Sequence, residues 1–118
     1  MRRPSTTRGS AKEAARPNDV LAHIFWRSTQ ARVLAHRGEP EAAERLGREA
    51  VAFAEESDFL NSHGDALMDL AEVLALAGKT DEASVALEQA VALYERKGNV
   101  VMAGRTRARL DELSALPH

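Results

Sequence analysis

Histidines and carboxylates are the side chains of this sequence that could take part in catalysis or hold a metal ion. The four histidines are scattered at positions 23, 36, 63 and 118, and none belongs to an H-E-x-x-H motif or a comparable ligand spacing. His63 and Asp65 could form a local pair, but a surface histidine in an early helical turn explains the same residues. Asp65 and Asp69 share one helix face, where solvation accounts for them. The sequence therefore predicts no catalytic residue and no metal ligand.

The sequence also gives little support for a catalytic nucleophile or a phosphate-binding loop. The chain has no cysteine, which excludes a thiol nucleophile, a disulfide framework and any Cys-based zinc or iron–sulfur site. The tripeptide G-K-T at 78–80 lacks the upstream glycine of a phosphate-binding loop, and Gly78 is explained as a turn residue. We expect no bound cofactor and no enzymatic activity.

Composition predicts the kind of domain that carries these residues. The 118 residues are 44% hydrophobic but only 4% aromatic, so one domain must build its core from alanine, leucine and valine. This argues against an immunoglobulin-like or barrel fold and favours an all-α protein. No apolar run approaches the roughly 18 residues of a membrane span, and no apolar segment follows the basic N-terminus as in a signal peptide. We expect a soluble, cytoplasmic protein without membrane contact.

The charge is divided unevenly along the chain. Residues 1–17 carry five basic side chains against one acidic, whereas the rest carries 11 basic and 17 acidic side chains. The first stretch has no large apolar residue after Met1, so we expect a disordered basic arm over 1–17 and a folded domain over 18–118. Scattered cations without aromatics favour a solvated leader or linker remnant over a tether to nucleic acid or a membrane surface.

Apolar residues recur at three- and four-residue spacing from Asn18 onward, which indicates helices. Gly38 can end the first helix and Pro40 can begin the second, while Asp58, Thr80 and Asn99 are candidate N-caps. Five helices are predicted, at about 19–37, 40–56, 59–77, 81–97 and 100–115. The loops are so short that sequential helices must pack antiparallel.

An internal repeat of 40 residues organises these helices. A-R-V-L-A-H-R-G at 31–38 aligns with A-E-V-L-A-L-A-G at 71–78, and Ala-Val-Ala at 50–52 aligns with the same tripeptide at 90–92. A weaker third copy aligns Gly64 with Gly104, and both glycines predict close helix contacts. The predicted units are 19–57, 58–97 and a partial, capping unit at 98–115, whose helix is polar on most sides.

The small residues of these units resemble the tetratricopeptide repeat, which has a small residue midway along its first helix, a glycine at the turn and two alanines seven apart in its second helix. The matching residues are Ala31, Gly38, Ala43 and Ala50 in one unit and Ala71, Gly78, Ala83 and Ala90 in the next. The resemblance implies an all-α, right-handed stack of antiparallel helical hairpins that binds proteins and does no chemistry.

Three departures from the usual pattern accompany the resemblance. The period is 40 rather than about 34 residues, which is similar to the MalT-like repeats of large bacterial regulators. Arg27 stands where the first helix usually has an aromatic residue, and Gly47 where the second helix usually has a large one. The segment V-A-L-Y-E-R-K-G-N-V-V-M-A at 91–103 resembles the C-terminal repeat tails of bacterial adenylate cyclases and ATPase-linked signalling proteins.

In stacks of this family the first helices line a concave face, which implies a short trough here. Its residues would be Phe25, Ser28, Arg32, His36, Asp65, Met68, Asp69, Glu72, Arg105 and Arg109, with Ala108 and Glu112 beside them. An acidic centre between arginines would suit a peptide with a central basic residue, and Phe25 and Met68 would be adaptable apolar contacts. The alternative is a solvated helix face with local ion pairs.

Phe25 and Trp26 are adjacent, so they cannot both face one core. The favoured interpretation packs Trp26 against the second helix and leaves Phe25 partly exposed. The alternative is an apolar patch for another subunit or for missing upstream repeats, because a stack needs capped ends.

Two functions follow from these observations. The first is a non-catalytic module or regulatory scaffold that binds a protein or peptide, as the C-terminal part of a larger signalling protein. The second is a fragment that self-associates into a homo-oligomer through its exposed N-terminal helix pair. Neither involves nucleic acid.

Overall fold

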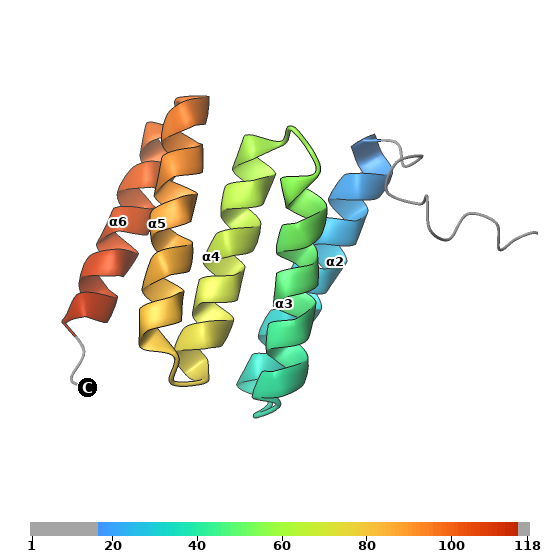
Figure 1. Ribbon diagram of the computed structural model, residues 1–118, viewed down its shortest axis with the longest axis vertical. Coiled ribbons are helices and arrows are strands. Elements are labelled where there is room, and N and C mark those ends of the chain that lie inside the picture. The colour runs from blue at the N-terminus through green and yellow to red at the C-terminus, as the bar shows by residue number, and fades with distance from the viewer. Residues whose placement is uncertain (1–16, 116–118) are drawn as a thin grey trace, which may run out of the picture.

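The computed structural model describes residues 17–115, and in this range the chain forms five helices joined by short turns (Figure 1). The helices are α2 (Pro17–His36), α3 (Pro40–Glu55), α4 (Leu60–Leu76), α5 (Thr80–Lys97) and α6 (Val100–Ser114). Each end lies within two residues of the position that the periodicity predicts. The predicted arm at 1–17 lies outside the described residues except for Pro17, which begins α2.

Three glycines reverse the chain after α2, α4 and α5. Gly38, Gly78 and Gly98 have φ angles of +81°, +82° and +82°, a left-handed conformation that glycine adopts without the steric cost of a Cβ. In each turn the next residue is the N-cap of the following helix, namely Glu39, Lys79 or Asn99. The glycine therefore sets both the end of one helix and the start of the next.

One of the three predicted N-caps is confirmed. Asn99 Oδ1 accepts a hydrogen bond from the Met102 amide at 3.1 Å. The prediction for Thr80 is wrong, because Thr80 is already the first residue of α5 and no side chain caps that helix. The prediction for Asp58 is also wrong, since Phe59 is the N-cap of α4 and caps without a side-chain hydrogen bond.

The helices form a stack of antiparallel hairpins in two layers. Helix α2 packs on α3 and α4 on α5, and each hairpin also packs on the next through α3 and α4 and through α5 and α6. Helix α2 additionally lies against α4, so the first helices share one side of the stack (Figure 1). Alanines at the crossing points let the helix axes approach closely. The six alanines that match the repeat motif each have at most 3% of their surface exposed: Ala31, Ala43, Ala50, Ala71, Ala83 and Ala90.

Two glycines inside helices make room for large neighbours. A Cβ at Gly47 would lie 3.0 Å from Leu70 Cδ1, and a Cβ at Gly64 would lie 2.7 Å from Tyr94 Cζ. Gly47 therefore replaces a large residue where α3 meets the leucines of α4. Gly104 was predicted to make a close contact like that of Gly64, and this is wrong. Nothing lies within 4 Å of its Cβ position. In the described chain, no residue lies opposite Gly104 in the way that Tyr94 lies opposite Gly64.

Arg27 occupies the position of the usual aromatic residue in α2 and packs on the ring of Phe53. Its guanidinium carbon lies 4.4 Å from the centroid of the Phe53 ring on α3 and 4.5 Å from that of Trp26, within the range of cation–π attraction. Its Nε donates to Glu49 of α3 at 3.1 Å. We predicted that Trp26 would pack against α3, but it stays 48% exposed, and the arginine covers Phe53 instead.

Candidate functional site

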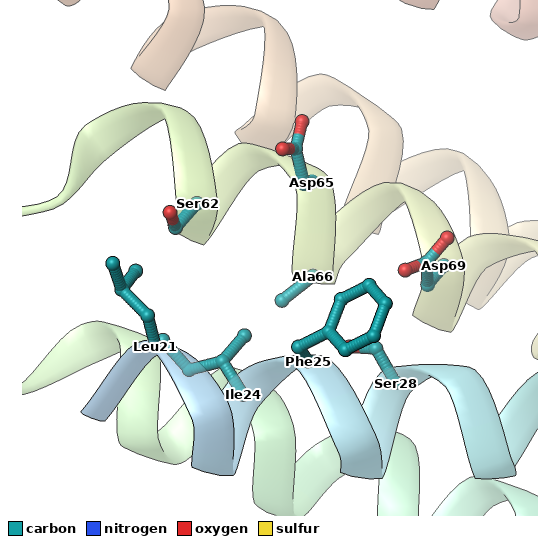
Figure 2. A pocket seen from close by; sticks show the side chains of 8 residues that line it. All are labelled: Leu21, Ile24, Phe25, Ser28, Ser62, Asp65, Ala66 and Asp69. Atoms are coloured by element: carbon teal, nitrogen blue, oxygen red, sulfur yellow. The ribbon is translucent and has the colours of Figure 1, made fainter. Parts of the chain in front are cut away.

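Two hollows lie on the side of the stack formed by the first helices. The α2–α4 hollow has a volume of about 190 Å³ and is shown in Figure 2. Leu21, Ile24, Phe25 and Ser28 of α2 line it opposite Ser62, Asp65, Ala66 and Asp69 of α4. The α4–α6 hollow is larger, about 370 Å³, and is lined by Arg32, Met68, Asp69, Ala71, Glu72, Arg105, Ala108, Arg109 and Glu112.

Half of the residues that line the α2–α4 hollow are apolar. Ile24 and Ala66 are buried, whereas Leu21 is partly exposed and 71% of Phe25 faces solvent. Figure 2 shows the Phe25 ring standing beside the hollow. An exposed ring next to an apolar hollow provides a contact surface for an incoming side chain.

Ser28 differs from its prediction as an outward-facing residue. It lies four residues after Ile24 and three before Ala31, and both of these are buried, so all three share one helix face. Only 4% of Ser28 is exposed. Its hydroxyl has no hydrogen-bond partner in the part of the chain that the structure describes, although it lines the hollow.

Asp65 is held in place from the second layer. The hydroxyl of Tyr94, a fully buried residue of α5, donates a short hydrogen bond to Asp65 Oδ1. Burial, followed by this hydrogen bond to a carboxylate, raises the pKa of Tyr94 well above its ordinary value. Gly64 admits the Tyr94 ring, so the glycine indirectly positions the neighbouring carboxylate.

Asp69 lines both hollows and is the most perturbed carboxylate of the face. Burial raises the pKa of Asp69 to about 6, against the opposing effect of Arg32, and the nearby charges of Glu72 and Asp65 raise it further. Arg32 compensates little, because its Nε is 3.9 Å from Asp69 Oδ1 and closer to Glu72, at 3.3 Å.

The α4–α6 hollow has arginines on either side of its acidic residues. His36 Nε2 lies 2.8 Å from Glu72 Oε2, so Glu72 contacts both His36 and Arg32. Arg109 pairs with Glu112 at 2.9 Å. Arg105 makes no ion pair with any residue in the described range, which leaves a cationic group at the edge of this hollow. Helix α6 also stands farther from α4 than α2 does, so this hollow is the wider of the two.

The ten residues predicted for one trough are thus divided between two hollows. Phe25, Ser28 and Asp65 line the α2–α4 hollow; Arg32, Met68, Glu72, Arg105 and Arg109 line the α4–α6 hollow; Asp69 lines both. His36 lines neither and binds Glu72.

Sequence reasoning did not include Leu21, Ile24, Ser62 or Ala66 in the site. Leu21 lies four residues before Phe25, and Ser62 lies three residues before Asp65. This spacing places them on the same helix faces and could have identified them.

A third hollow, of about 340 Å³, lies on the opposite side between α3 and α5, and the sequence did not predict it. Leucines of α4 form part of its wall, and an ion-pair network borders it. Arg48 contacts Glu44 and Glu82, both at 2.8 Å, and Lys79 contacts Glu44 at 2.8 Å. The hydrogen bond from Lys79, followed by that from Arg48, lowers the pKa of Glu44. These contacts link α3 to the start of α5.

The described residues contain no group of three or more histidine or acidic side chains placed to hold a metal ion. None of the helices from α2 to α6 is both long and apolar enough to cross a membrane.

Comparison with known proteins agrees with the hairpin stack. The sequence model of the tetratricopeptide repeat matches residues 21–96, from the first turns of α2 almost to the end of α5. No curated protein and no solved structure matches the chain. Repeats of this family generally mediate protein–protein interaction and are generally non-catalytic. Since the match covers well over half of the sequence and the described helices pair as hairpins, the chain belongs to the tetratricopeptide repeat family.

Proposed function

We propose that this chain is a non-catalytic interaction module that binds an extended protein segment along the first helices α2, α4 and α6. The observation that carries the proposal is that two hollows lie on this one side and share Asp69. A segment crossing α4 could place one side chain in each hollow. Phe25 and Met68 offer an aromatic ring and a flexible thioether at the two hollows, which suits an adaptable contact.

Charge indicates the kind of segment. Asp65, Asp69 and Glu72 place acidic groups along α4, with Arg32 on one side and Arg105 on the other. A bound segment with a central basic residue and an acidic residue toward α6 would meet the opposite charge at each position. Such complementarity contributes mainly to specificity and to the association rate.

Selection from a random peptide library on the immobilised chain tests this function, followed by calorimetric measurement of Kd. Phe25→Ala is expected to weaken binding about tenfold, the effect of removing an exposed aromatic anchor. Val100→Ala is the matched control, because Val100 is 78% exposed on α6 and lines none of the hollows described above. Selected peptides whose Kd is the same for both variants and the parent chain would show that the segment binds elsewhere.

Self-association is a second candidate, favoured by the uncovered side of α2. Ala66 and Val73 of α4 are buried, at 1% and 0% exposure, on a helix that packs against the preceding hairpin. Their counterparts 40 residues earlier are Trp26 and Val33, which are 48% and 40% exposed. We propose that a second copy of this chain covers this side of α2, as the α2–α3 hairpin covers α4.

Sedimentation velocity over a concentration series tests self-association. The parent chain is expected to form dimers at high concentration, and Val33→Lys is expected to stay monomeric, since a lysine at the interface would be desolvated. Val85→Lys is the control, because Val85 is 52% exposed on α5, away from this side. A parent chain that remains monomeric at millimolar concentration would refute this candidate.

We also propose that the module is the regulatory, C-terminal part of a larger cytoplasmic signalling protein of the MalT-like type. The 40-residue period and the segment at 91–103 support this. The neighbouring reading frame in the genome tests it. A cyclase or ATPase domain encoded in continuity with this chain is expected, and a neighbour without any signalling domain would contradict the proposal.

A further inference from the structure

The α2–α4 hollow contains a buried polar atom that the fold leaves unused. Ser28 is 96% buried and lines the hollow, and its Oγ has no partner among the described residues. A serine inside a helix commonly donates to the carbonyl four residues earlier, but Ser28 makes no such bond. Since a buried hydroxyl without a partner is costly, this atom indicates that a ligand completes the site.

The charged groups of the hollow are both carboxylates, which accept hydrogen bonds, so a donor ligand suits them. Asp65 lines the hollow, but Figure 2 shows its carboxylate directed away from α2, and its Oδ1 accepts from Tyr94. Asp69 lines the same hollow, and among the described residues its ion pair is a long one, with Arg32 Nε 3.9 Å from Oδ1. The Asp69 carboxylate and the Ser28 hydroxyl together suit a cationic group with several N–H donors, and the negative charge of Asp65 lies one helical turn away.

The apolar side chains of the hollow favour lysine over arginine. Leu21, Ile24, Phe25 and Ala66 contribute apolar side chains to the lining of the same hollow. A lysine side chain fits such a lining, because its four-carbon stem packs against apolar surface while its ammonium group stays with polar partners. Arginine fits less well, since its planar fork prefers a carboxylate with both oxygens free, and Asp69 Oδ1 already pairs with Arg32 at 3.9 Å.

We propose that the α2–α4 hollow is a specificity pocket for one lysine side chain of the bound segment, with Ser28 and Asp69 receiving its ammonium group. This inference rests on the proposed function. It identifies the central basic residue of the bound segment as a lysine and places that lysine in the α2–α4 hollow. Arg32 does not fill the pocket, because its side chain is 48% exposed and lies closer to Glu72 than to Asp69. Burial raises the pKa of Asp69 to about 6, which is consistent with a carboxylate whose ionised form a bound ammonium group would stabilise.

The test is a titration of the full ¹⁵N-labelled chain at pH 7.5 with three small probes, followed by NMR. The probes are Nα-acetyl-lysine methylamide and the corresponding arginine and norleucine compounds. The lysine compound is expected to shift the amides of Ser28, Ala66 and Asp69 and to bind at least fivefold more tightly than the other two. Ser28→Ala is expected to weaken lysine binding at least fivefold, whereas the exposed-site control Ser114→Ala leaves it unchanged.

The outcomes separate this inference from the proposed function. Equal binding of the three probes, or lysine binding that Ser28→Ala does not change, overturns the lysine pocket. If the selected peptides still bind and their affinity is lower for the Phe25→Ala variant, the proposed function is supported without the lysine pocket. A lysine-specific shift combined with no selected peptide supports the pocket and refutes the binding of an extended segment. Enrichment of lysine in the selected peptides, together with the specific shift, supports both.

Discussion

Replacing Gly64 with alanine tests the packing that positions Asp65. The new Cβ would lie 2.7 Å from Tyr94 Cζ, 2.8 Å from Cε1 and 3.1 Å from Cε2, closer than ordinary van der Waals contact. Tyr94 cannot easily yield, because it is fully buried and its hydroxyl is bonded to Asp65. Alanine gains about 1 kcal/mol over glycine within a helix. Overpacking costs about 1–3 kcal/mol, and weakening a hydrogen bond to a charged group costs about 1.5–3 kcal/mol more.

The net expectation for Gly64→Ala is a loss of about 1.5–5 kcal/mol in the free energy of unfolding. For a domain of this size that corresponds to a fall in Tm of about 4–8 °C per kcal/mol. Gly104→Ala is the matched control, since Gly104 has the same repeat position in α6 and open space at its Cβ. It is expected to gain about 1 kcal/mol. Thermal and urea unfolding, followed by circular dichroism at the helical band, measure both variants.

A Gly64→Ala variant that is stabilised as much as Gly104→Ala would refute this reasoning. A second variant identifies the partner of the clash. In a Tyr94→Leu background the space beside Gly64 is larger, so the Gly64→Ala substitution is expected to cost much less there. A cost that is the same in both backgrounds would show that Tyr94 is not the residue that excludes the methyl group.

Three further predictions concern single residues. Asn99→Ala is expected to lower the free energy of unfolding by about 1 kcal/mol, through loss of the N-cap, in a urea titration; a change no larger than that of Thr80→Ala would contradict the cap. The pKa of Asp69 is raised in the folded protein from 3.8 to about 6, so the folded state holds this proton more tightly and stability falls as pH rises between these values. Asp69→Asn lacks this proton, so its Tm should fall less than that of the parent chain between pH 4 and pH 6; parallel curves would exclude the shift. Arg27→Met keeps an apolar stem but removes the guanidinium between Trp26 and Phe53, and a loss of about 1 kcal/mol is expected in urea unfolding; unchanged stability would show that the ring contacts contribute nothing.

The helices could be predicted closely because local signals coincide with the repeat. Gly38 and Gly78 occupy equivalent places in the two units, and each adopts the left-handed angle that reverses the chain. The N-caps were harder to predict, because the geometry of the turn selects the residue directly after the glycine whatever its type. At Gly98 that residue is Asn99, which can cap, but at Gly78 it is Lys79, which cannot.

The details of the site depend on tertiary contacts that the sequence does not encode locally. Ser28 is polar, which favoured a surface position, but the period of the helix places it with Ile24 and Ala31 on the buried side. Gly64 and Gly104 match in register, yet only Gly64 has an aromatic ring opposite. The division of the trough into two hollows follows from the different spacing of α2 and α6 from α4, and no residue pattern reports that spacing.

The central claim is that the side formed by the first helices binds a protein segment. Mapping amide chemical shifts of the ¹⁵N-labelled chain with a selected peptide tests it most directly. The account predicts that the largest shifts fall on α2, α4 and α6, around Phe25, Asp69 and Arg105. Shifts centred instead on the hollow between α3 and α5, around Val51 and Val85, would contradict it.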